Sequence, residues 1–178
     1  GALDSALLMV YHKSLTNGVS SYKLYRESIA GGNYTVVTAN VEELYQQFGG
    51  GIEKHINGIR RFAHYIDANS NQKPSGLFLI GKGIREANLN SFTSDGPGTR
   101  FNASRFQQSL IPAFGHPSSD VAITAGLGGT YDWAPLLPTG RISVRTETEL
   151  LGYLDKVIQY EAQQDENVIY DTPNKDWQ

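Results

Sequence analysis

The stretch Pro135 to Gln164, PLLPTGRISVRTETELLGYLDKVIQYEAQQ, predicts a short strand that leads directly into a long helix. Pro135 and Pro138 each lack a backbone donor and favour an extended approach to the strand. Ile142 and Val144 are β-branched and favour strand geometry. The sequence therefore predicts a strand over residues 141–144.

The segment that follows has the pattern of a capping box. Thr146 is the predicted N-cap, and Glu149 is expected to bond back to the backbone N–H of Thr146. The strand must then end near Arg145, and a helix of about five turns is expected over residues 146–164. Its apolar stripe at helical spacing contains Leu150, Leu151, Leu154, Val157 and Ile158.

Three earlier segments predict strands, at Ala6–Tyr11, Tyr34–Thr38 and Leu77–Ile80. The first is apolar throughout, which is typical of a strand buried on both faces of a parallel sheet. Apolar residues at helical spacing predict helices between these strands. The helical stripes are Tyr22, Tyr25 and Ile29, ended by Gly31 and Gly32; Val41, Leu44 and Tyr45, after an N-cap at Asn40; and Ile56, Ile59, Phe62, Ala63 and Ile66.

This alternation predicts one α/β domain over residues 1–164, a three-layer sandwich with helices on both faces of the sheet. The four strands form a mainly parallel sheet with the flavodoxin-like or caspase-like order 2-1-3-4. Residues 165–178 are predicted to be a linker. The regular pattern lapses between Gly81 and Pro138, a length that is usually functional or an insertion. Short elements are expected there at Ala103–Gln108, Leu110–Ala113 and Val121–Thr124.

Composition excludes several classes of protein. The net charge of -3, with 19% charged residues, gives no electrostatic footprint for nucleic acid or an anionic membrane. The longest apolar run is only Ala6–Tyr11, so neither a signal peptide nor a membrane span is predicted. The absence of cysteine excludes disulfides and thiolate metal sites.

Isolated polar residues predict no cofactor or metal site. The histidines at 12, 55, 64 and 116 are not spaced as metal ligands, so surface or structural roles are expected for them. Gly81-Lys82-Gly83 follows a strand but lacks the length and hydroxyl residue of a phosphate-binding loop. We interpret it as a strand-exit turn.

Three further features lie in or beside the long connection, the segment between Gly81 and Pro138, and each has two interpretations. Asp120 and Arg141 either pair to brace the connection against the last strand, or form a surface pair of little consequence. The triplet 102–104, Asn-Ala-Ser, is a possible glycosylation acceptor, but we interpret it as a loop or helix cap. Tyr131 and Trp133 either cover the sheet or face a partner.

Several segments, in the same order, resemble the gingipain-type cysteine peptidases. The segments 138–150 and 153–161 are similar to the family's "G-R-I … T … E … K-V … Y-E" region. The resemblance is strongest to the branch related to type IX secretion signal peptidases and sortases, and it covers nearly the whole chain. Other matching segments are Ala6–Tyr11 (the first strand), Ile56–Asp67 (a helix), Gly76–Gly83 (a strand and turn, with Lys82 where the family usually has Asp) and Phe114–Asp120.

The resemblance implies a role without catalysis for these residues. The family's catalytic domain has two adjacent α/β halves on a caspase-like fold, with the His-Gly and Cys motifs in the second. The chain resembles only the first half, and it has no cysteine to serve as a nucleophile. It is thus expected to support a missing C-terminal catalytic half of the same polypeptide, a hydrolase acting on protein or peptide substrates. No catalytic residue is assigned within the chain.

The resemblance also implies a bacterial protein that is secreted or at the cell surface, engaged in proteolysis or sortase-like processing. The alternative is an autonomous flavodoxin-like module that binds a small ligand or peptide at the C-terminal ends of the strands. The apolar tail residues are expected to fold back or to dock on a neighbouring copy; they are Val168, Ile169, Tyr170 and Trp177.

Overall fold

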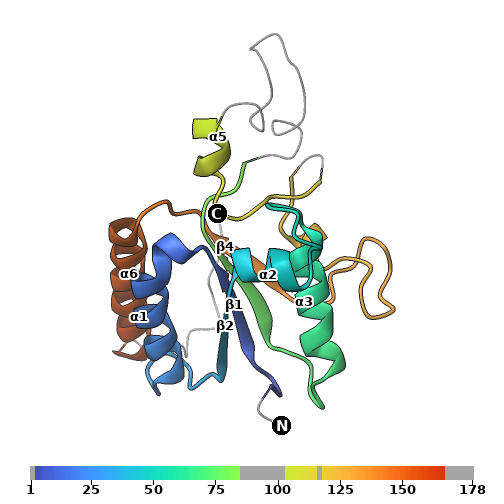
Figure 1. Cartoon of the computed structure of the whole chain (residues 1–178). Helices are drawn as coiled ribbons and strands as arrows, with labels where there is room; N and C mark the ends of the chain where they lie inside the picture. Colours follow the sequence, from blue (N-terminus) through green and yellow to red (C-terminus); the bar gives the residue numbers. More distant parts are fainter. Residues whose placement is uncertain (1–2, 85–102, 116–117, 167–178) are drawn as a thin grey trace, which may run out of the picture.

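The structure is a computed structural model that describes residues 3–84, 103–115 and 118–166 (Figure 1). Its centre is a four-stranded sheet with the order β2-β1-β3-β4, and every pairing is parallel. This confirms the predicted fold class and strand order. The strands are β1 Leu7–Tyr11, β2 Val36–Asn40, β3 Gly76–Ile80 and β4 Thr139–Ile142.

Two strands lie two residues from their predicted positions. The backbone N–H of Tyr34 donates to the carbonyl of Arg26, so this residue belongs to the turn after a helix and not to β2. At the other edge, the carbonyl of Pro138 already accepts from Leu77 in β3. Proline is tolerated at the start of a strand on a sheet edge, because its missing donor is not needed there. The pairing with β3 is thus already in place at Pro138, and β4 begins at the next residue, Thr139.

Helices cover both faces of the sheet (Figure 1). α1 and α6 pack together on one side, and α2 and α3 pack together on the other. The core between these layers is centred on β1, where Leu8, Met9 and Val10 have no exposed surface. The helices are α1 Thr16–Glu27, α2 Val41–Gln47, α3 Asn57–Ala68, α5 Ala103–Gln108 and α6 Glu147–Glu166, with 3-10 turns η1 Lys13–Leu15 and η3 Val121–Ile123.

α1 ends earlier than its predicted stripe. The hydroxyl of Ser28 donates to the carbonyl of Tyr25 and terminates the helix. Ile29, predicted to share one helical face with Tyr22 and Tyr25, lies beyond the end of α1 and is 92% exposed. Of the two glycines predicted to end the helix, Gly32 has the positive φ of +101°.

α6 presents a narrower buried face than its sequence suggests. Leu150 and Leu154 are buried, whereas Leu151 and Ile158 are 40% and 37% exposed. The buried positions follow the narrow seam of a helix that packs mainly on one other helix, here α1. The predicted apolar stripe is therefore only partly buried, with Leu151 and Ile158 at its exposed margin.

The start of α6 contains most of the predicted capping box. The N–H of Glu149 donates to Thr146 Oγ1 at 3.2 Å, as predicted. The Glu149 carboxylate, however, accepts from the N–H of Arg145 at 2.7 Å and not from that of Thr146. The side chain reaches one residue further back than expected and fixes the end of the strand-helix connection.

Replacement of Thr146 by alanine is expected to lower the free energy of unfolding by about 1 kcal/mol, because α6 loses its side-chain N-cap. Urea denaturation monitored by circular dichroism measures this loss. Thr148→Ala is a matched control, since its side chain is exposed on the same helical turn. Equal midpoints for the two variants would contradict the assignment of Thr146 as the cap.

Part of the long connection is regular, as predicted. Ala103–Gln108 is helical and Val121–Ile123 is a 3-10 turn. Residues 110–113 form no helix or strand, yet Leu110 and Ile111 are buried and their N–H groups both donate to the Lys82 carbonyl. The interpretations of Asn102 and His116, of the linker and of the apolar tail fall outside the described residues. No helix within the described ranges is long and apolar enough to cross a membrane.

Candidate functional site

Arg141 organises the C-terminal edge of the sheet. Its side chain is only 9% exposed and pairs with Asp120 through two hydrogen bonds, Nε to Oδ2 at 2.8 Å and Nη2 to Oδ1 at 2.7 Å. It also donates to the carbonyls of Gly81 (2.8 Å), Ile111 (3.0 Å) and Pro112 (2.9 Å). A guanidinium matches this arrangement because its donors form a rigid planar fork. The pair therefore braces the long connection against β4, and the surface-pair alternative was wrong.

The Gly81-Lys82-Gly83 segment is a strand-exit turn, as interpreted from the sequence. The N–H of Gly81 donates to the carbonyl of Ile142, and the N–H of Lys82 donates to that of Val144. These two donors are consequently unavailable to a phosphate group. A Cβ at Gly83 would lie 2.7 Å from the Ile111 carbonyl oxygen, so the turn packs tightly on the chain beside it.

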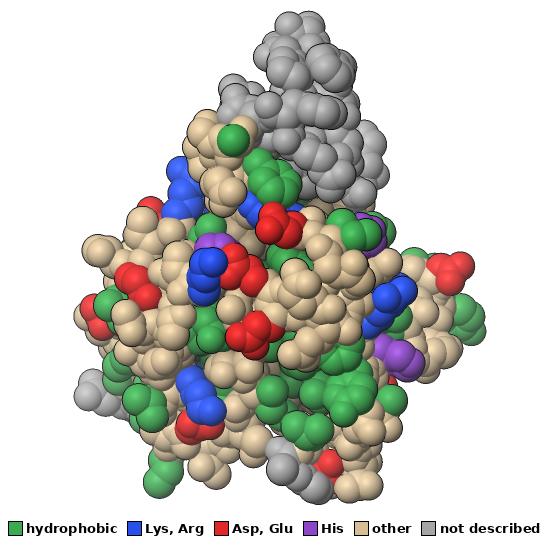
Figure 2. Space-filling view, viewed as in Figure 1, with side chains coloured by type: hydrophobic (Ala, Val, Ile, Leu, Met, Phe, Trp, Pro, Cys, Tyr) green, Lys and Arg blue, Asp and Glu red, His purple; other side chains and the backbone are tan. Residues whose placement is uncertain are grey.

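A pocket of about 490 Å³ lies at the C-terminal ends of β1 and β2, the edge where doubly wound sheets place their ligands. In Figure 2, acidic side chains in red and basic ones in blue gather over α2, which forms one wall of the pocket. The opposite wall comes from the residues of α5 and just after it. The lining residues are His12, Lys13, Asn40, Glu42, Glu43, Tyr45, Gln46, Glu53, Lys54, Gln107 and Leu110.

Glu42 faces two side chains at the end of β1, those of Lys13 and His12. Its carboxylate lies 3.1 Å from Lys13 Nζ and 3.6 Å from His12 Nε2. Burial lowers the pKa of His12, although Glu42 opposes the shift, so the imidazole is neutral at pH 7. Its Nδ1 accepts from the N–H of Ser14 at 3.2 Å, which leaves the Nε2 proton towards Glu42.

Lys54 closes the pocket on the side of α5. Its ammonium donates to the carbonyl of Phe106 and lies 3.9 Å from the centroid of the Phe106 ring. Burial lowers the pKa of Lys54, and Glu53 partly offsets this. Lys54 has a positive φ of +57°, an uncommon conformation for a residue with a side chain. The contact joins the loop after α2 to α5.

Tyr45 has the one buried side-chain polar atom without a hydrogen-bond partner in the part of the chain that the structure describes. The residue is 2% exposed and lines the pocket. Burial raises the pKa of Tyr45, and the carboxylates of Glu42 and Glu53 raise it further. The hydroxyl therefore keeps its proton at all physiological pH values.

The other predicted residues do not join this pocket. His55 Nδ1 accepts from the N–H of Asn57 at the start of α3, and His64 is exposed on that helix. Tyr131 and Trp133 stack on each other and are 74% and 78% exposed, so they do not cover the sheet. The described residues contain no group of three His, Cys, Asp or Glu that could hold a metal ion.

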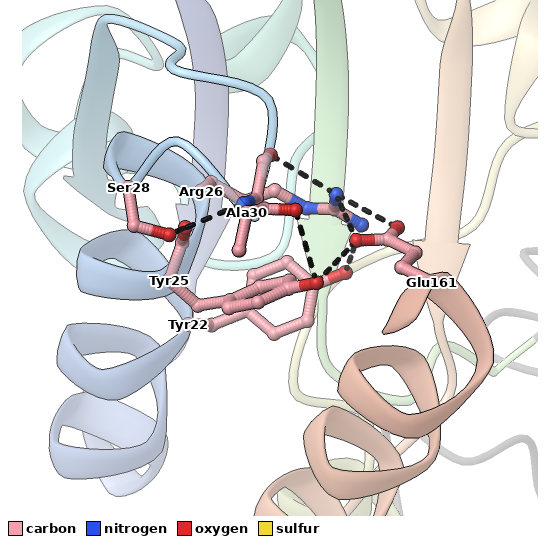
Figure 3. A network of polar contacts seen from close by, with 7 residues as sticks. Tyr22, Tyr25, Arg26, Ser28, Ala30 and Glu161 are labelled. Carbon is pink, nitrogen blue, oxygen red and sulfur yellow. Dashed lines mark hydrogen bonds and ion pairs between the residues drawn. The ribbon is translucent and has the colours of Figure 1, made fainter. Parts of the chain in front are cut away.

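A second polar cluster joins α1 to α6 at the far end of the molecule (Figure 3). The carboxylate of Glu161 accepts from the Tyr25 hydroxyl at 2.5 Å and from Arg26 Nη1 at 3.0 Å, and Arg26 Nη2 donates to the Tyr22 hydroxyl. Desolvation and the neighbouring Glu161 raise the pKa of Tyr25 to about 12. The cluster clamps the two helices together.

The sequence singled out four residues near the C-terminal edge of the sheet, but it did not predict the pocket there. The four residues are His12, Lys82, Asp120 and Arg141. The Asn40 cap was a usable signal, because it starts α2 directly after β2 and so places Glu42 at the carboxyl end of the sheet. No local signal places Lys54 against α5.

The fold and its polar edge define a doubly wound α/β domain, and comparison with known proteins assigns it to a family. The sequence model of peptidase family C25 matches residues 3–175, so the chain belongs to this family, the gingipain family of cysteine peptidases. No curated protein sequence matches significantly.

A solved structure shows the same fold. The chain superposes on the crystal structure of dimeric latent PorU from Porphyromonas gingivalis with a TM-score of 0.66 and 20% sequence identity. The match covers 92% of this chain and 17% of the PorU chain. The chain thus spans about a sixth of the protein that it resembles.

Proposed function

We propose that this chain is the non-catalytic α/β half of a gingipain-like cysteine endopeptidase, and that a second half supplies the catalytic His and Cys. The observation that carries the proposal is the family C25 match over residues 3–175 of a chain without cysteine. Cysteine peptidases need a thiolate nucleophile beside a base, which these 178 residues cannot provide.

In this role, residues 1–164 act as a buttress and residues 165–178 lead to the second half of the same polypeptide. The C-terminal edge of the sheet is rigid, because hydrogen bonds from the Arg141 side chain join β4 to the turn after β3 and to the long connection. The substrates of the complete enzyme are proteins or peptides, and its location is the bacterial surface or exterior. The fold shared with PorU supports a place among type IX secretion peptidases, with either a sortase-like or a degradative activity.

The purified 178-residue chain is expected to hydrolyse neither casein nor fluorogenic Arg and Lys peptides. Hydrolysis that iodoacetamide blocks would indicate a cysteine peptidase. A longer polypeptide from the same gene, continuing past Gln178, is expected to hydrolyse them and to lose that activity when its Cys is replaced by Ala. A downstream sequence without a strand ending in His-Gly and a later strand ending in Cys would refute the proposal. Hydrolysis by the short chain alone would equally refute it.

The second candidate is a binding module whose ligand sits at the C-terminal ends of the strands. The pocket beside α2 favours this function, since it lies at the expected edge and is lined by polar groups. Ligand binding by the isolated chain, with no catalytic domain in the downstream sequence, distinguishes this candidate from the first.

A further inference from the structure

We propose that the C-terminal tail of this chain, residues 167–178, binds back on its own domain in a groove on the sheet face beside α1 and α6. The anchor of the tail is its apolar run at Val168, Ile169 and Tyr170. The inference names the surface on which the tail docks, and it holds whether or not a catalytic half follows the tail.

The groove lies where the parallel sheet lacks its usual cover. Parallel sheets are normally covered on both faces, so residues of their inner strands are buried. Phe78 is at the centre of β3, an inner strand, yet its side chain is only partly buried, as is that of Leu7 in β1. The rings of Phe78 and of Tyr22 in α1 lie 5.6 Å apart. The incompletely covered face is therefore the one on which α1 and α6 lie.

Gly140 extends the uncovered surface to β4. It is the register partner of Phe78, and it is exposed. A Cβ at this position would meet only the Phe78 ring, at 3.8 and 3.9 Å, so the described residues give no steric reason for a glycine here. A glycine inside a strand often marks the close approach of another backbone. The surface thus suits an extended segment that lies directly on β3 and β4.

A pocket of about 390 Å³ forms part of the groove, beside the start of β1 and β3. The two charged residues of its lining, Arg26 and Glu161, bond to each other at 3.0 Å in the cluster of Figure 3. Three aromatic rings, those of Tyr22, Tyr34 and Phe78, also line the pocket. Because its charges are paired and its walls are largely aromatic, the pocket suits an apolar chain segment better than an ion.

The tail begins beside this groove. α6 ends at Glu166, and Glu161 of the same helix lines the pocket, about 7.5 Å back along the helix axis. Residues 167–178 span up to about 40 Å when extended, more than twice the length of β3. The run 168–170 is the most apolar part of the tail and the part nearest to α6, so it is the part that reaches the groove first.

Pairing of the tail with the outer edge of β4 is a less favourable alternative. α1 leads from β1 to β2, away from β4, and α6 lies on the same face as α1. Parallel crossovers are right-handed in about 98% of cases, and right-handed crossovers on one face of a sheet all run in the same direction. A crossover through α6 to a strand beyond β4 would run in the opposite direction and be left-handed. The sheet face is therefore the favoured site.

Amide hydrogen exchange of the full 178-residue chain, measured by mass spectrometry, tests the proposal. The amides of residues 168–170 are expected to exchange at least about tenfold more slowly than those of a synthetic peptide of residues 165–178. Sedimentation velocity at the same protein concentration is expected to show a monomer, because the tail binds within its own chain.

A variant in the groove locates the contact. Gly140→Lys places a long charged side chain over the Phe78 ring, so it is expected to abolish the protection of residues 168–170. Gly152→Lys is the matched control, since a Cβ there meets no atom within 4 Å and the residue is exposed on α6. Its tail is expected to be protected as in the parent. Circular dichroism verifies that both proteins fold.

A second pair of variants tests the contact from the side of the tail. Val168→Asp combined with Tyr170→Asp is expected to release residues 168–170, because two carboxylates would have to leave water for an aromatic groove. Thr172→Asp combined with Asn174→Asp adds the same charge after the apolar run and is expected to leave the tail bound. If the Gly140→Lys protein does not fold, this pair of variants decides the question alone.

Three results would overturn the proposal. The first is exchange of residues 168–170 at the rate of the synthetic peptide. The second is full protection in the Val168→Asp/Tyr170→Asp protein or in a folded Gly140→Lys protein, which would place the tail elsewhere. The third is a dimer whose dissociation on dilution removes the protection, which would place the tail on a second copy. None of these results depends on a downstream His or Cys, which the hydrolysis assays test separately.

Discussion

Replacement of Arg141 by alanine is expected to lower the free energy of unfolding by about 3 kcal/mol, because one partner of a largely buried ion pair is lost. The Asp120 carboxylate is left without its cation, and the carbonyls of Gly81, Ile111 and Pro112 each lose a donor. Urea denaturation followed by both fluorescence and circular dichroism measures the loss.

Two further variants isolate the cause of this effect. Arg145→Ala removes the same side chain four residues later, where it is exposed, and is expected to change stability by about 0.5 kcal/mol at most. Arg141→Lys keeps the charge but not the planar fork, so it is expected to recover little of the loss. If the Arg141→Ala and Arg145→Ala proteins unfold at the same urea concentration, the guanidinium does not hold the sheet edge together.

The strand order was predictable because it depends on pattern and chirality. The apolar run of β1 indicated a central strand, and right-handed crossovers then allowed few arrangements. Strand boundaries were less accessible. Val144 is β-branched and favours a strand, but it lies beyond the end of β4. Its carbonyl accepts from the N–H of Lys82 in the turn after β3.

The starts of helices were predicted more accurately than their ends and than the burial of the residues on their apolar faces. Asn40 and Thr146 both cap as expected, since a cap is a local hydrogen bond between neighbours in sequence. The end of α1 depends on the Ser28 hydroxyl, and the exposure of Ile29 follows from it. The exposure of Leu151 depends on how few elements pack on α6, which the helical period does not specify.

The candidate site was the least predictable feature, because its parts are distant in sequence. Glu42 reaches Lys13 from another element, and Lys54 reaches Phe106 across 52 residues. Arg141 could be paired with Asp120 from the sequence only as one of two alternatives. Its burial to 9% exposure, which decides between them, results from packing of the long connection.

The second large effect on stability is expected at Gly31, in the turn after α1. It follows from the atoms that surround this glycine and not from its own dihedral angles. A Cβ at Gly31 would lie 1.9 Å from the carbonyl oxygen of Tyr25 and 2.9 Å from the Cα of Arg26. Both are backbone atoms, so relief requires movement of the last turn of α1 and cannot come from a side-chain rotation. Gly31→Ala is therefore expected to lower the free energy of unfolding by about 3 kcal/mol.

The same substitution at Gly152 is the matched control, because a Cβ there meets no atom within 4 Å on the exposed side of α6. Gly152→Ala is expected to stabilise the protein by about 0.5–1 kcal/mol through the higher helix propensity of alanine. Movement of Tyr25 and Arg26 would also separate them from Glu161, so amide hydrogen exchange in α6 is expected to rise in the Gly31→Ala protein alone. Unchanged exchange in α6, despite a lower stability, would show that the turn is strained without loosening the contact between the two helices.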